Sequence, residues 1–143
     1  MKNILILLLF SLTLFGANVD EFAKEMGYER YYTTALLKAK KTHKPIVMIL
    51  GADYCPWCRK FENKTLQSAL IKPILDKDFV VLIVDKKYDI KTFPSKYRTQ
   101  FTPKVFFIDA RDENILFETT GYLKRKEFAK SLDKAQNLYR ATQ

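Results

Sequence analysis

Three short segments of the chain are continuously apolar, and they predict buried β-strands. They are Ile46–Leu50, Phe79–Val84 and Val105–Ile108. Runs of β-branched and aromatic residues without polar alternation are typical of strands covered on both faces. A fourth segment, Ile115–Thr119, mixes apolar and polar residues, which favours a place nearer the edge of a sheet. The polar residues 110–114 would join it to the third segment as a hairpin.

Around these segments, apolar residues recur at the spacing of α-helices. In the first such segment Tyr32, Ala35 and Ala39 share one face, and Pro45 follows its end. The predicted helices are residues 31–42, residues 56–70 with a further turn or kink ending near Leu75 because of Pro73, a short helix at 92–98, and residues 124–139. Strands alternating with helices indicate parallel pairs, and the hairpin adds an antiparallel pair. The pattern therefore predicts an α/β fold with a central mixed β-sheet flanked by helices.

The N-terminal residues 1–17 have the layout of a secretory signal peptide. Lys2 is followed by the apolar stretch Ile4–Phe15 and by the small residues Gly16 and Ala17. This stretch is shorter than the ~20 residues that a membrane-spanning helix needs. The bulky Phe15 near the expected cleavage site leaves an uncleaved anchor as the alternative. In either case residues 18–143 are expected to form a single domain outside the cytoplasm, in the periplasm or a comparable compartment.

The formal net charge of the chain is +9, to which Lys2 contributes one charge. A basic balance of this size is compatible with nucleic acid or an anionic membrane as a partner. However, the lysines are spread along the chain among acidic residues, so we expect no nucleic-acid binding. The densest basic run, Lys124 to Lys126, opens a predicted helix and is interpreted as a solvated face.

The chain has two cysteines, and both belong to the motif Cys55-Pro56-Trp57-Cys58 after the first predicted strand. Pro56 suits the first position of a helix, where its missing N–H costs nothing. Cys55 would then be the N-cap residue, facing free N–H groups and the positive end of the helix dipole. These surroundings favour a thiolate, which is the attacking species in disulfide exchange. Cys58 lies one turn further on, where it could resolve a mixed disulfide.

Three other interpretations of the motif are less well supported. A zinc site needs about four ligands, whereas the chain offers two cysteines and one histidine, His43. A purely structural disulfide would close too small a loop to constrain the unfolded chain much. Covalent haem attachment would require a histidine in place of Arg59. Redox exchange without a metal or organic cofactor is therefore favoured.

A second feature is the pair Thr102-Pro103, immediately before the third apolar segment. Proline cannot donate a hydrogen bond within a sheet, so it belongs at the start of the strand. The ordinary interpretation is a turn proline, because most bonds that precede proline are trans. The functional interpretation is a cis-proline loop opposite the cysteines, which leaves the Thr102 backbone free to pair with an extended peptide.

Taken together, these segments resemble the exported thioredoxin-like proteins. The resemblance covers roughly Tyr31 to Tyr139 and rests on LGADYCPWCRKF at 50–61, Thr102-Pro103 before VFFID, and Gly121-Tyr122 before a terminal helix. It implies a thioredoxin-like fold, Cys55 as nucleophile, Cys58 as resolving thiol and a cis bond at Pro103. The sequence departs from cytoplasmic thioredoxins at two places. Ile49 stands where those proteins carry a buried acid, and the inner pair of the motif is Pro56-Trp57 in place of Gly-Pro. Trp57 is either a partner contact or simply an exposed aromatic residue.

The resulting hypothesis is an exported thiol–disulfide oxidoreductase acting on protein thiols or disulfides. Exported relatives include reductants that serve cytochrome c assembly or disulfide repair, and the small size of this chain favours that direction. Such a reductant would draw electrons from a membrane thiol-electron transporter. The alternatives are an oxidase that donates disulfides and a non-catalytic module that binds peptides. We expect a monomer.

Overall fold

The computed structural model describes residues 19–142, so the predicted signal peptide at residues 1–17 lies outside the described residues. The described chain forms a four-stranded mixed sheet with the strand order β2-β1-β3-β4. The strands are β1 (Ile46–Gly51), β2 (Val80–Asp85), β3 (Lys104–Ile108) and β4 (Ile115–Thr120). β1 pairs with β2 in parallel and with β3 in antiparallel, and β3 pairs with β4 in antiparallel. The predicted mixed sheet, with the fourth strand at an edge, is confirmed.

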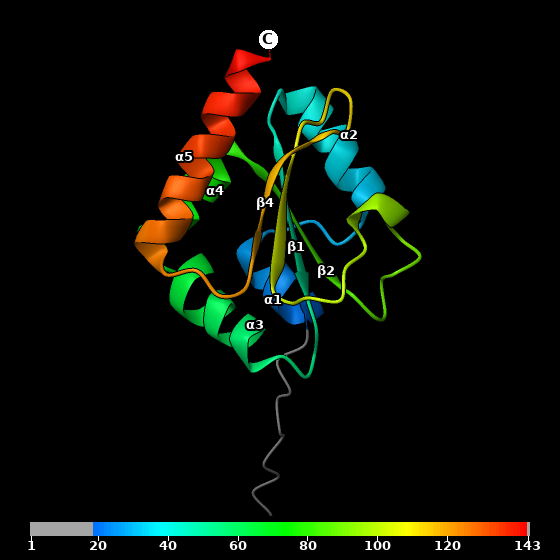
Figure 1. Cartoon of the computed structure of the whole chain (residues 1–143), viewed down its shortest axis with the longest axis vertical. Coiled ribbons are helices and arrows are strands. Elements are labelled where there is room, and N and C mark those ends of the chain that lie inside the picture. The colour runs from blue at the N-terminus through cyan, green and yellow to red at the C-terminus, as the bar shows by residue number, and fades with distance from the viewer. Residues whose placement is uncertain (1–18, 143) are drawn as a thin grey trace, which may run out of the picture.

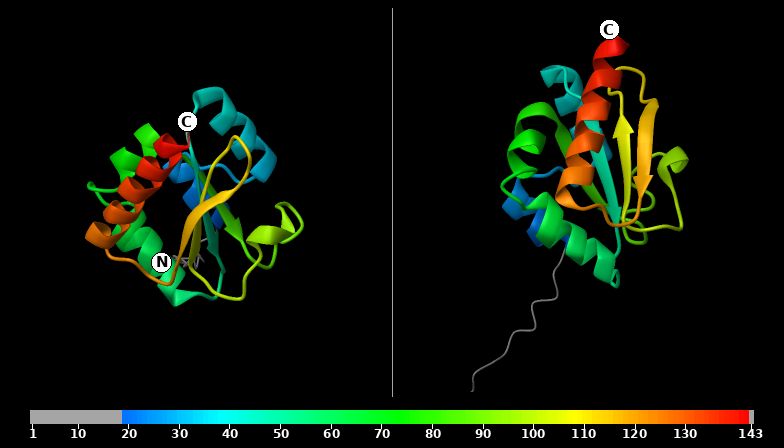
Figure 2. Two further views of the ribbon diagram at one scale, coloured as in Figure 1. Left: turned by 45° about the horizontal axis from the view of Figure 1, so that its top comes forward. Right: turned by 60° about the vertical axis from the view of Figure 1, so that its left-hand side comes forward.

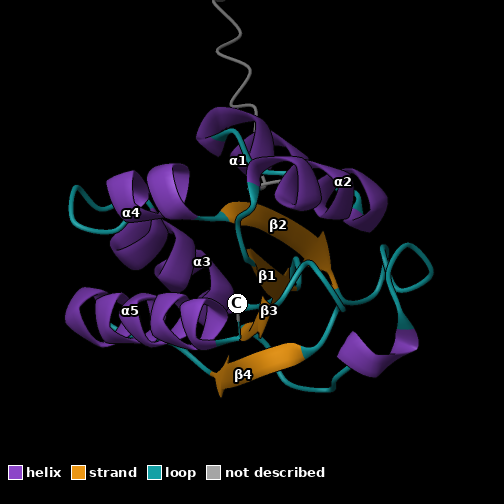
Figure 3. Ribbon diagram, turned by 90° about the horizontal axis from the view of Figure 1, so that it is seen from above, coloured by secondary structure: helices purple, strands orange, loops and turns teal. Residues whose placement is uncertain are grey.

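Helices cover both faces of this sheet (Figures 1 and 3). They are α1 (Val19–Met26), α2 (Tyr32–Thr42), α3 (Pro56–Phe61), the π-helical turn η1 (Glu62–Leu66), α4 (Lys72–Asp78), the 3-10 turn η2 (Ser95–Tyr97) and α5 (Arg125–Ala141). Side chains from α1, α3, α4 and α5 pack on one face, together with Val47, Ile49 and Phe107 of the sheet. Tyr32 of α2 and Tyr97 of η2 pack on the other. Successive residues of β1, β2 and β3 therefore point into two separate cores, which is why these three strands are almost entirely apolar.

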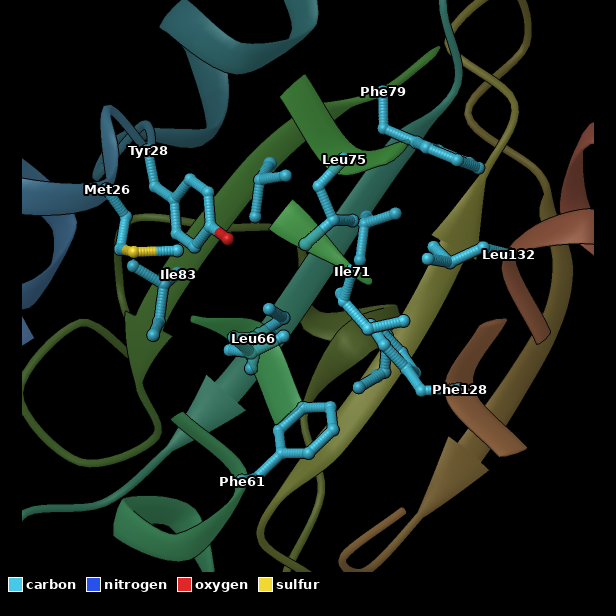
Figure 4. Packing of buried hydrophobic residues seen from close by; sticks show 14 of the residues in the cluster. Met26, Tyr28, Phe61, Leu66, Ile71, Leu75, Phe79, Ile83, Phe128 and Leu132 are labelled. Carbon is cyan, nitrogen blue, oxygen red and sulfur yellow. The ribbon is translucent and has the colours of Figure 1, made fainter. Parts of the chain in front are cut away.

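The larger core lies between the sheet and the helices α1, α3, α4 and α5. Phe61, Leu75 and Phe128 come from three different helices and meet there (Figure 4). The rings of Phe61 and Phe128 are 5.0 Å apart between centroids, in an edge-to-face arrangement. This contact fixes α3, and with it the residues just before α3, relative to α5.

The structure corrects several details of the predicted elements. Helix α1 was not predicted from the sequence, and the helix expected at 92–98 is only the short turn η2. The helix expected to kink at Pro73 instead ends near Leu66, and Pro73 stands in the first turn of a new helix, α4. A proline is well tolerated there because the first N–H groups of a helix have no partner within it.

Candidate functional site

The two cysteines lie where the chain leaves β1 and enters α3, at one end of the sheet (Figure 1). Cys55 is the N-cap residue of α3 and Pro56 begins the helix, as the sequence predicted. The Cys58 N–H donates to the Cys55 sulfur at 3.2 Å. The two residues form a disulfide, with their Cα atoms 5.2 Å apart.

The two cysteine residues are both buried but differ in exposure. Cys55 is 7% exposed, whereas Cys58 is 2% exposed. The backbone of Gly51, the last residue of β1, lies beside Cys58: a Cβ atom added there would stand 3.9 Å from the Cys58 sulfur. Of the two cysteines, Cys55 therefore has the greater relative exposure.

The loop before β3 approaches Cys55 through Thr102, and the ribbon shows it close to the start of α3 (Figure 2). Its Thr102–Pro103 peptide bond is cis, and the Thr102 hydroxyl donates to the Cys55 sulfur at 3.5 Å. The Pro103 carbonyl accepts the Gly121 N–H at 2.8 Å. Among residues 19–142, no hydrogen bond uses the backbone N–H or carbonyl of Thr102. This backbone is thus available to an extended partner chain.

Trp57 lies beside the disulfide and is 56% exposed. Its ring is 5.9 Å from that of Tyr122, and the Lys60 ammonium lies over both rings, at 4.7 Å and 4.9 Å from their centroids. Trp57 and Tyr122 line a shallow pocket of about 350 Å³ with Thr102, Pro103 and Gly121. We call it the apolar pocket. Each of the predicted site residues Cys55, Pro56, Trp57, Cys58, Thr102 and Pro103 thus lies at this end of the sheet.

A buried carboxyl group near the cysteines was missed by sequence reasoning. Glu62 is 3% exposed and lies one helical turn after Cys58, whose carbonyl accepts the Glu62 N–H. Its carboxylate pairs with Arg59 at 2.8 Å. Burial raises the pKa of Glu62 to about 7, although the positive charge of Arg59 acts in the opposite direction. The spacing of four residues from Cys58 was the available signal, because it places both residues on one face of a helix.

Asp85 is a second buried acid at this end of the sheet. It is the last residue of β2, where it pairs with Gly51 of β1, and it is 2% exposed. Its carboxylate accepts the N–H groups of Lys87 at 2.7 Å, Tyr88 at 2.9 Å and Asp53 at 3.2 Å. Because Asp53 stands two residues before Cys55, this carboxylate fixes the loop that carries Cys55. An acidic residue next to an apolar run gives no sign in the sequence that it accepts backbone N–H groups.

No helix within residues 19–142 combines the length and the apolar character required to cross a membrane. In the same range, no group of three or more His, Cys, Asp and Glu side chains is arranged so as to hold a metal ion.

Comparison with known proteins relates the chain to a described family. Residues 32–136, more than half of the chain, match the family described as a thioredoxin-like domain. The chain is 27% identical over 95 residues to the disulfide bond reductase DsbH of Chlamydia pneumoniae, a match covering 59% of this chain and 57% of DsbH. It is 38% identical over 50 residues to spermatogenesis-associated protein 20 of Rattus norvegicus, covering 35% of this chain and 6% of that protein. The matches thus span less than two thirds of these relatives.

Among solved structures, the chain is similar to a thioredoxin from Thermus thermophilus. The TM-score is 0.67, with 21% sequence identity over 76% of this chain and 86% of the thioredoxin. At this level of identity the likeness establishes the fold.

Proposed function

Because the chain belongs to the thioredoxin-like domain family, we propose that it is a thiol–disulfide oxidoreductase that acts on partner proteins, with Cys55 as nucleophile and Cys58 as resolving thiol. The observation that carries this proposal is the Cys55–Cys58 disulfide at the start of α3, with the sulfur of Cys55, the more exposed residue, in contact with Thr102 of the cis-proline loop. N–H groups at the start of a helix stabilise a thiolate on Cys55 once the disulfide is reduced.

In the reducing direction, the reaction proceeds in two exchange steps. The Cys55 thiolate attacks one sulfur of a partner disulfide, forming a mixed disulfide and releasing one partner thiolate. The Cys58 thiolate then attacks the Cys55 sulfur and releases the second partner thiolate. The partner disulfide is thus reduced by two electrons, and its two thiolates take up protons to become thiols. The protein is left with the Cys55–Cys58 disulfide. The free Thr102 backbone would hold the partner segment during both steps.

We favour the reducing direction in the cell. This choice is supported by a relative that is named a disulfide bond reductase. A reductant outside the cytoplasm must be reduced again after each cycle. A membrane thiol-electron transporter would supply these electrons, and residues 1–17 would direct the chain to that compartment.

The exchange mechanism is tested by trapping. In the full-length Cys58→Ala variant, the first step would proceed and the second would not, so mixed disulfides with partner proteins should accumulate on Cys55. The Cys55→Ala variant is the matched control and should trap far less. If partners remain non-covalently bound and unchanged in both variants, the chain is a peptide-binding module and the proposal is wrong.

The direction is tested by the reduction potential of the Cys55–Cys58 pair, measured by equilibration with glutathione or dithiothreitol buffers. A reductant should have a potential near that of thioredoxin, about −270 mV. A potential near about −120 mV would identify a disulfide-donating oxidase instead.

A further inference from the structure

A second hollow, which we call the basic groove, adjoins the apolar pocket. It has a volume of about 560 Å³, and its lining includes Lys60, Lys64, Lys124 and Arg125, whose side chains are all exposed. Tyr122 lines both the basic groove and the apolar pocket. The two hollows therefore share a wall, and the surface leads from the cis-proline loop beside Cys55 to the start of α5.

The walls of the basic groove are held in place by buried contacts. Lys60 and Lys64 come from α3 and η1, whereas Lys124 and Arg125 come from the start of α5. Between them, the Thr65 hydroxyl, on a residue with no exposed surface, donates to the Leu123 carbonyl at 2.7 Å. This hydrogen bond ties the two walls together, so the spacing of the cations is a feature of the folded protein.

The positive charge of the basic groove is largely uncompensated. Within the described part of the chain, none of its four cationic side chains takes part in a salt bridge. The nearby Glu62 pairs with Arg59 instead. The Glu127 carboxylate accepts the backbone N–H of Lys124 at 2.9 Å and offsets part of the charge at the start of α5. A carboxylate from outside would therefore find several cations that are not already paired with a carboxylate.

We propose that the basic groove selects partner proteins that carry acidic residues close to the reacting cysteine. A partner segment would run in extended form past Thr102, with an apolar side chain beside its cysteine on Trp57 and Tyr122. One or more carboxylates further along the segment would be bound by Lys60, Lys64, Lys124 and Arg125. This inference rests on the proposed function, because the groove can select partners only if the neighbouring disulfide exchanges with them. That position also favours a polypeptide over a lipid surface as the occupant.

The test compares disulfide-linked dimers of synthetic peptides. Each peptide has one cysteine next to a leucine, and a pair of variable residues that are either two glutamates or two glutamines. The variable pair lies further along the peptide, in one set on the N-terminal side of the cysteine and in the other set on the C-terminal side. The rate constant for oxidation of the reduced full-length protein is followed by the fluorescence of Trp57, the single tryptophan. One of the two placements brings the variable pair to the basic groove. In that placement, at an ionic strength of about 0.01 M, the glutamate peptide should react about five- to tenfold faster than the glutamine peptide. At about 1 M this ratio should approach one, because salt screens exposed charges.

Two double variants identify the groove as the source of the preference. Lys64→Gln with Lys124→Gln should reduce the ratio of the two rate constants to less than about twofold. Lys40→Gln with Lys41→Gln removes the same charge from the last turn of α2, at the end of β1 away from the cysteines, and should leave the ratio unchanged.

The neutral reagent 2-hydroxyethyl disulfide separates failure of this inference from failure of the proposed function. If the wild-type protein does not exchange with this reagent, the proposed function fails. If it does exchange but both peptides react equally in both placements, the acidic-partner inference is wrong. A membrane contact would replace the acidic-partner inference if two results came together. The glutamate and glutamine peptides would react at equal rates, and the Lys64/Lys124 variant would lose binding to phosphatidylglycerol vesicles.

Discussion

The Cys55 sulfur lies between two backbone features, the first turn of α3 and the cis-proline loop. It accepts an N–H from Cys58 and a hydroxyl hydrogen from Thr102. At the position six residues before Cys55 the chain has Ile49, which is 2% exposed and packs in the core. The buried acid nearest to the motif in sequence is therefore Glu62, which follows the cysteines.

Burial of Glu62 predicts a stability that falls with rising pH. The pKa is raised from 4.5 to about 7 in the folded protein, so between these values the folded state holds a proton that the unfolded state has lost. The free energy of unfolding should then fall by roughly 3 kcal/mol from pH 4.5 to 7 through this one group. In the Glu62→Gln variant this loss should be absent, so the free energy of unfolding of the variant should rise relative to that of the wild type as the pH increases.

Urea denaturation at several pH values measures this effect. Glu25→Gln, at an exposed position of α1, is the control and should follow the wild-type pH dependence. Parallel pH profiles for the wild type and the Glu62→Gln variant would contradict the prediction.

Asp85 should contribute to stability through the backbone N–H groups that it accepts. In Asp85→Ala the N–H groups of Asp53, Lys87 and Tyr88 lose their acceptor, and the free energy of unfolding should fall by about 3 kcal/mol. Thermal or urea denaturation of the oxidised protein measures the change. The exposed Asp112, whose carboxylate accepts the Asn114 N–H, offers the comparison: Asp112→Ala should cost less than about 1 kcal/mol. Equal losses in the two variants would be inconsistent with this role.

At the scale of elements, the helix that begins at the cysteines changes its hydrogen-bond pattern after one and a half turns. In η1 the Gln67 N–H donates to the Glu62 carbonyl, five residues back, at 3.1 Å. This wider turn buries Glu62, Thr65 and Leu66, and Thr65 then reaches Leu123. The sequence predicts a helix here, but periodicity does not distinguish i+4 from i+5 bonding. The choice depends on contacts with α5 and the loop before it.

Helix α1 also contributes to the core, although its pattern was overlooked in the sequence. Phe22 is 7% exposed and packs edge-to-face with Tyr28 at 6.0 Å between ring centroids. Phe22→Ala should therefore lower the free energy of unfolding by about 3 kcal/mol. Lys24→Ala, on the exposed face of the same helix, should change it by no more than about 0.5 kcal/mol. If Phe22→Ala matches Lys24→Ala in denaturation experiments, α1 is not part of the cooperative unit.

At the scale of the whole molecule, the two edges of the sheet bear on self-association. Glu29 forms a parallel bridge with Leu82 and covers part of the β2 edge. The β4 edge carries the charged residue Glu118 and two threonines. Charged edges resist pairing with a second copy. Light scattering should therefore give the monomer mass, 16.8 kDa for the full chain, and a mass twice as large would contradict this prediction.

The sequence by itself determined the local features of the protein. Unbroken apolar runs identified three of the four strands, because a strand covered on both faces has few polar positions. The order of Cys55, Pro56 and Cys58 identified a helix start with a sulfur at its N-cap, because a proline in the first turn and free N–H groups are local requirements. The thioredoxin-like fold followed from the order of these elements and the family resemblance, and it is confirmed.

The tertiary structure decided which distant residues meet. Leu50 at the end of β1 pairs with Lys104 at the start of β3, and this antiparallel register brings Thr102 and Pro103 to Cys55. The basic run at Lys124, interpreted from the sequence as a solvated face, adjoins Lys60 and Lys64 because α5 packs against η1. The surroundings of Glu62 and Asp85 arise in the same way. Burial and pairing depend on segments far apart in the chain, and no local pattern records which segments will become neighbours.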